Sequence, residues 1–79
     1  MARIPTETGP RFVQEDHYKG RKIIVVTGYH AFSDKWPIHI YIEEPGKGTT
    51  KVADQFLADS EREAFDEGFR IATKEIDGS

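Results

Sequence analysis

The sequence predicts an α+β fold, a three-stranded antiparallel meander with one C-terminal helix packed on one face of the sheet. Residues 60–76 place apolar side chains at helical spacing, whereas residues 22–29 and 36–43 are rich in β-branched and aromatic residues. Short turn-forming segments separate the strands, and such connections favour antiparallel neighbours. A chain of 79 residues supplies one hydrophobic core, so we expect a single domain.

The N-terminal segment, residues 1–11, has no regular hydrophobic period and contains two prolines and a glycine. We expect this segment to be a flexible leader and the domain to span residues 12–79. Phe12 and Val13 leave open an alternative in which a short fourth strand precedes the meander.

Residues 22–29, with the sequence KIIVVTGY, are the strongest strand prediction. Four consecutive β-branched residues suit a pleated sheet. Because this apolar run is continuous, both faces of the strand require cover. The pattern does not decide which alternate pair faces the helix, Ile23 with Val25 or Ile24 with Val26.

Residues 36–43 alternate between two faces, as expected of a strand with one face buried. His39 and Tyr41 point away from the predicted helix. A turn over residues 44–48, which contain Pro-Gly, leads to a third, weaker strand over residues 49–56. The side chains predicted to lie under the helix are Trp36, Ile38, Ile40 and Ile42.

Residues 60–76 carry a complete helix signature. Ser60 and Glu63 form a capping box, in which the hydroxyl accepts the amide of Glu63 and the carboxylate reaches back to the amide of Ser60. Gly68 costs ~1 kcal/mol relative to alanine in mid-helix, which indicates a close approach to the sheet. Gly78 is expected to end the helix in a left-handed conformation. The apolar stripe consists of Phe65, Phe69, Ala72 and Ile76.

Charge and cysteine content argue against several functional classes. The chain has 11 Lys and Arg against 14 Asp and Glu, a net charge of −3, which argues against binding to a nucleic-acid backbone. There is no cysteine, so disulfides and thiolate metal sites are excluded. No apolar run approaches the ~20 residues of a membrane helix. We therefore expect no membrane association and a cytoplasmic location.

Residues of chemically active types are present, but none forms a pattern that predicts catalysis or metal binding. His17, His30 and His39 do not have the spacing of zinc ligands. Ser33 and Asp34 follow His30, but turn chemistry is sufficient to explain them. We expect no catalytic residue, no metal and no cofactor, and we expect that the protein is not an enzyme.

The predicted sheet has more apolar surface than one helix covers, and monomers tend to avoid leaving such surface exposed. Either the N-terminal arm or a second copy of the chain provides the second cover. The arm brings only two apolar residues, so we expect a homodimer, and the sequence identifies no other protein partner. The candidate interface residues are Ile24, Val26, His39 and Tyr41.

An alternative hypothesis is nucleic-acid binding. The turn near residue 20 contains three cations, Lys19, Arg21 and Lys22. Tyr41 and His39 on the sheet face would then stack on bases, as aromatic side chains do in single-strand binders.

The order of the predicted elements is accompanied by two short patterns. Tyr18-x-Gly20 precedes the first long strand, and the helix opens with S-x-x-E-A-x-x-x-G-x-x-x-A, formed by Ser60, Glu63, Ala64, Gly68 and Ala72. With these patterns the chain resembles a family of small uncharacterised bacterial βββα domains and is distantly similar to the N-terminal part of HicB-type antitoxins. The resemblance covers about residues 18–77. It implies a small meander packed on a helix and, as an alternative function, an antitoxin-like regulatory domain; it implies no functional residue.

Overall fold

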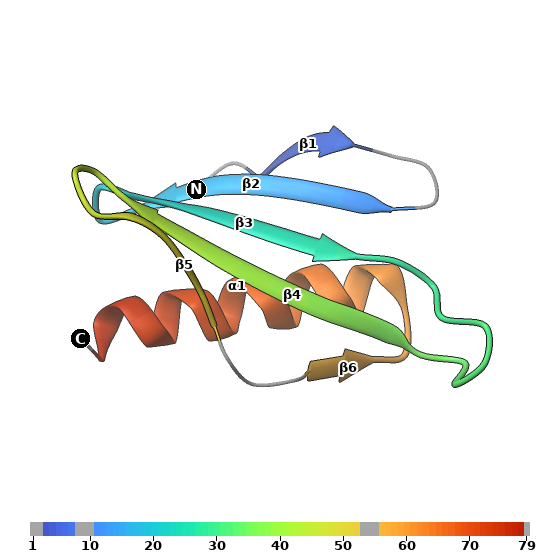
Figure 1. Cartoon of the computed structure of the whole chain (residues 1–79). Helices are drawn as coiled ribbons and strands as arrows, with labels where there is room; N and C mark the ends of the chain where they lie inside the picture. The colour runs from blue at the N-terminus through green and yellow to red at the C-terminus, as the bar shows by residue number, and fades with distance from the viewer. Residues whose placement is uncertain (1–2, 8–10, 53–55, 79) are drawn as a thin grey trace.

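The computed structural model describes residues 3–7, 11–52 and 56–78, with only the backbone for residues 6 and 7. One antiparallel sheet is covered on one face by a single helix, which confirms the α+β class (Figure 1). The strands follow the order β1-β2-β3-β4-β5, and β6 pairs with the same edge of β4 as β5 does. The elements are β1 (Ile4–Glu7), β2 (Phe12–Tyr18), β3 (Arg21–Thr27), β4 (Trp36–Glu44), β5 (Gly48–Lys51), β6 (Phe56–Ala58) and α1 (Glu61–Asp77).

The prediction of three strands, or four, was wrong, because the described residues form a sheet of six strands. The N-terminal side accounts for part of the difference. β2 extends through residues 12–18 and pairs with β3 along its whole length, so it is much longer than the two apolar residues suggested. Within the expected leader, Ile4–Glu7 forms β1. The polar residues of β2 are stabilised by interactions with side chains of the neighbouring strand; Glu15, for example, pairs with Lys22 of β3 at 3.0 Å.

The strand expected over residues 49–56 is divided in two. β5 pairs with the C-terminal end of β4, and β6 pairs with its N-terminal end. Between them the amide of Val52 donates to the carbonyl of Ile40 at 3.0 Å. Residues 53–55 of the expected strand lie outside the described residues. The chain after the β4–β5 turn therefore returns along a single edge of β4.

The pairing register decides which side of β3 meets the helix. Ile23, Val25 and Thr27 lie opposite residues of β4 that are buried beneath α1, namely Ile42, Ile40 and Ile38. Ile24 and Val26 therefore point to the other side of the sheet, where they lie opposite Tyr41 and His39. We call this side, away from α1, the open face.

Helix α1 begins as the sequence predicts, with one difference in its cap. The amide of Glu63 donates to the Ser60 hydroxyl at 3.1 Å, but the Glu63 carboxylate accepts from the amide of Asp59 at 3.4 Å instead of from that of Ser60. The left-handed terminator was wrong: Gly78 has φ −83° and ψ −4°. Its amide continues the helical pattern by donating to the carbonyl of Lys74 at 2.9 Å, so no reversal of the backbone is needed there.

The helix and the sheet approach each other most closely at Gly68. A β-carbon at this position would lie 2.5 Å from Cγ1 of Val25 and 3.2 Å from Cγ2 of Ile38. Both contacts are shorter than ordinary van der Waals separations. The packing role predicted for this glycine is confirmed.

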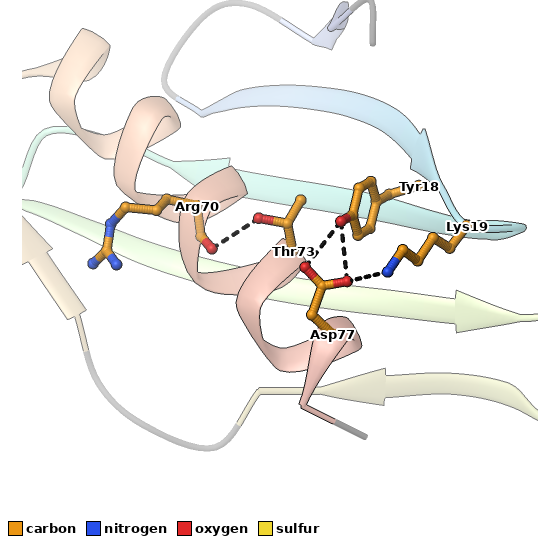
Figure 2. A network of polar contacts seen from close by, with 5 residues as sticks. All are labelled: Tyr18, Lys19, Arg70, Thr73 and Asp77. Atoms are coloured by element: carbon orange, nitrogen blue, oxygen red, sulfur yellow. Dashed lines mark hydrogen bonds and ion pairs between the residues drawn. The ribbon is translucent and has the colours of Figure 1, made fainter.

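The C-terminal end of α1 is tied to the β2–β3 turn by polar contacts (Figure 2). The hydroxyl of Tyr18 donates to the two carboxylate oxygens of Asp77 at 3.0 and 2.9 Å, and Nζ of Lys19 lies 2.5 Å from Oδ1. These hydrogen bonds hold the pKa of Asp77 below its usual value. The turn itself is tight, because Lys19 and Gly20 both have positive φ.

Candidate interaction surface

Apolar side chains extend across the open face from one edge of the sheet to the other. At the outer strands, Ile4 of β1 is 56% exposed and Leu57 of β6 is 62% exposed. Their register places both on the open face, since Ile4 lies opposite Glu15 and Leu57 opposite Pro37. The apolar residues of this face are Ile4, Val13, Ile24, Val26, Pro37, Tyr41 and Leu57.

The centre of the open face is a shallow hollow of about 640 Å³. All four residues that the sequence predicted for an interface line it. Their part in an interface stays a prediction, but the register brings them together from two strands. The lining residues are Arg11, Val13, Ile24, Val26, His39, Tyr41 and Lys51.

Among the described residues that line the hollow, the ionisable side chains other than Tyr41 are basic. Nζ of Lys51 lies 5.9 Å from the centre of the Tyr41 ring, within range of a cation–π interaction. Apolar surroundings lower the pKa of His39, and the charge of Lys51 lowers it further. Two described acids on this face, Glu15 and Glu43, lie beside Lys22, which pairs with Glu15 at 3.0 Å. The hollow therefore combines an apolar floor with a cationic rim.

The β3–β4 loop, residues 28–35, presents an aromatic residue that the sequence analysis did not single out. Phe32 is 99% exposed. The loop around it is held by backbone hydrogen bonds between His30 and Lys35, the shorter of 2.8 Å, and by the Tyr29 hydroxyl, which donates to Asp34 at 2.6 Å. The Tyr29 ring also packs on Trp36, with ring centres 5.7 Å apart. The sequence signal that could have identified Phe32 is an aromatic residue within an otherwise polar turn.

The cations of the β2–β3 turn all have acidic partners. Lys19 pairs with Asp77 at 2.5 Å, and Arg21 pairs with Glu44 at 3.4 Å. Hydrogen bonds to Asp77 and Glu15 raise the pKa of Lys19 and of Lys22, respectively. This turn, on which the nucleic-acid hypothesis partly depended, therefore presents its positive charges already neutralised.

The three histidines lie in separate parts of the fold. His17 is on β2, His39 on β4 and His30 in the β3–β4 loop. In the described part of the chain, no three His, Asp or Glu side chains gather as a metal site requires. Nδ1 of His30 lies 2.9 Å from the Ser33 hydroxyl, but Asp34 accepts from Tyr29. The Ser33–His30 pair thus lacks the orienting carboxylate of a catalytic triad.

Comparison with known proteins gave no match to a family model, to a curated protein or to a solved structure. Among the described residues, no helix is both long enough and apolar enough to cross a membrane.

Proposed function

We propose that this protein is a small non-enzymatic interaction module that self-associates through the open face of its sheet, forming a homodimer. One observation carries the proposal. Apolar side chains from β1, β3, β4 and β6 that are exposed or only partly buried share a face that no described element covers, whereas α1 covers the other face (Figure 1). Soluble monomers rarely leave an apolar surface of this kind in water.

The size of the chain is compatible with such an interface. A stable interface of standard size buries about 800 Å² on each partner, about 15% of the 5207 Å² surface of this chain. Within the described part of the N-terminal arm, β1 extends the sheet at its edge instead of folding over the face. A second copy is the occupant that best fits the open face.

Sedimentation velocity at increasing protein concentration tests the proposal. We expect the wild-type mass to rise from monomer to dimer in the micromolar range, and we expect Val26→Glu to remain a monomer because it places a charge on the open face. Thr50→Glu is the matched control, since Thr50 is also a β-branched strand residue but lies on the helix side of the sheet edge, opposite Ile42. A wild-type chain that stays monomeric throughout would refute the proposal.

One observation favours a second candidate, nucleic-acid binding. Arg11 and Lys51 border a hollow that contains Tyr41 and His39, and cations beside aromatic side chains are typical of single-strand binders. Retention on heparin that falls steeply with salt would support this candidate. The antitoxin-like role depends on the same property and is tested by the same column.

A further inference from the structure

We propose that the two copies of the dimer interlock, with Phe32 of each copy inserted into the hollow on the open face of the other. This inference rests on the proposed self-association and adds the contact that defines its geometry. It gives a role to two surface features that do not contribute to the core: the exposed side chain of Phe32 and the hollow on the open face.

Phe32 is suited to act as an anchor. Its side chain is 99% exposed, so the folded monomer gains almost nothing from it. The loop that carries it is held in place by the Tyr29–Asp34 hydrogen bond and the bridge between His30 and Lys35. An aromatic side chain presented on an ordered loop loses little conformational freedom when it binds, which favours affinity.

The hollow is suited to receive an aromatic ring. Its floor is formed by Val13, Ile24 and Val26, and its volume of about 640 Å³ leaves room for a ring and part of the loop behind it. The rim carries the cation of Lys51, and cations bind favourably over the face of an aromatic ring. Lys51 already makes such a contact with a ring on its own chain, that of Tyr41.

Charge also favours the loop as the occupant. Asp34 follows Phe32 by two residues and has an exposed side chain, so insertion of the loop brings a carboxylate to the cationic rim. By contrast, two copies stacked with their hollows directly opposed would bring two Lys51 side chains together, and like charges in contact are costly. An offset arrangement that places each loop over the opposite hollow avoids this repulsion.

The topology allows both insertions at once. The β3–β4 loop extends beyond the sheet at the end opposite the β2–β3 and β4–β5 turns (Figure 1). Each copy carries both this anchor and this hollow. Two copies related by a two-fold axis therefore use both pairs and form a closed dimer in place of an open chain.

Cross-linking between two singly substituted chains tests this contact directly, because the natural sequence has no cysteine. Ala31→Cys places a thiol beside the anchor without removing Phe32, and His39→Cys places one in the hollow. Mixed and treated with a short bismaleimide, these variants are expected to form a heterodimeric product. Lys74→Cys, on the exposed side of α1, replaces His39→Cys in the control mixture and is expected to give at least tenfold less product.

A second measurement covers the case in which a cysteine disturbs the interface. Phe32→Ala is expected to leave the circular dichroism and melting of the monomer unchanged and to raise the dimer dissociation constant about tenfold or more. A dimer that Val26→Glu abolishes but Phe32→Ala leaves intact would overturn the interlocked arrangement and preserve the proposed function. A wild-type monomer at all concentrations would overturn both.

Discussion

Replacement of Gly68 by alanine changes the stability of the fold through two effects of opposite sign, a gain in helix propensity and a loss from overpacking. Alanine is the better helix former by ~1 kcal/mol, so an exposed position would gain stability. At Gly68 the added β-carbon would lie 2.5 Å and 3.1 Å from the two γ-carbons of Val25 and 3.2 Å from Cγ2 of Ile38. Val25 is fully buried and belongs to a stiff β-branched type, so its side chain cannot turn aside. The helix must therefore move away from the sheet.

The expected balance is a net loss of stability. Overpacking a well-filled core costs roughly 1–3 kcal/mol, and the first contact here is severe enough to place this case at the upper end. After subtraction of the gain in helix propensity, we expect Gly68→Ala to lower the free energy of unfolding by about 1–2 kcal/mol. For a domain of this size, that loss corresponds to a melting temperature lower by roughly 5–15 °C.

Urea unfolding followed by circular dichroism, at one fixed protein concentration, measures this change. Gly78→Ala is the matched control, because its backbone is right-handed and its nearest neighbours are carbonyl oxygens of the helix itself, the closest at 3.3 Å. Val25→Ala combined with Gly68→Ala is expected to cost less than the sum of the two single changes, since the new methyl group partly fills the space that is vacated. A stabilised Gly68→Ala variant would show that the helix does not approach the sheet this closely.

Four further changes test other contacts of the fold. Ser60→Ala removes the N-cap and is expected to cost ~1 kcal/mol in urea unfolding, whereas Ser60→Asp retains most of the stability. Asp16→Val is expected to stabilise the fold by about 1 kcal/mol in the same assay, because Asp16 is buried and its Oδ2 has no partner among the described residues. Asp77 has a lowered pKa in the folded state. Its carboxylate therefore contributes to the free energy of unfolding above the ordinary carboxyl pKa of 3.8, and this contribution is lost as pH falls through the folded pKa. The difference in the free energy of unfolding between wild type and Asp77→Asn should shrink in that acid range. His39 also has a lowered pKa in the folded chain, so its protonation opposes folding; the free energy of unfolding of the wild type should fall as pH drops below the ordinary value of 6.5, and less so in His39→Gln.

The elements that the sequence predicted correctly are those with local signals. The capping box of Ser60 and the four-residue and three-residue steps between apolar positions define α1 without reference to the rest of the chain. β3 and β4 were recognisable from β-branched runs and strict alternation. What remained undecided was the face of β3, because Ile23 with Val25 and Ile24 with Val26 are chemically equivalent pairs. The ladder with β4 decides it, and a ladder is a contact between distant parts of the sequence.

The strands that the sequence missed or predicted only weakly are the polar ones. β2 contains glutamine, glutamate, aspartate and histidine within seven residues, and β5 has no buried side chain. Neither buries a continuous apolar face of its own, so no period of two is visible. Backbone pairing with β3 and β4 and cross-strand pairs such as Glu15–Lys22 stabilise them instead. Such strands follow from their neighbours, and single-sequence patterns do not reveal them.

The residues of the candidate site divide in the same way, between those on the correctly predicted strands and those on segments that the sequence did not identify clearly. Ile24, Val26, His39 and Tyr41 were chosen from the two strands that were predicted correctly, and the structure places all four around one hollow. Arg11, Val13 and Lys51 were missed because they come from segments whose strands were not recognised or were recognised only weakly. Because Arg11 and Lys51 come from other segments, the two correctly predicted strands do not by themselves reveal the basic residues that distinguish this hollow from an apolar patch.

The added strands also change the physical argument for self-association. A meander of three strands would leave an open face about as wide as the helix that covers the other side. The actual sheet is wider by β1 and β2, yet the cover is still the one helix, which packs mainly against β3 and β4 (Figure 1). Apolar residues at both outer strands, Ile4 and Leu57, show that the uncovered surface widens with the sheet. The larger the sheet, the greater the free energy that a second copy would gain by covering it.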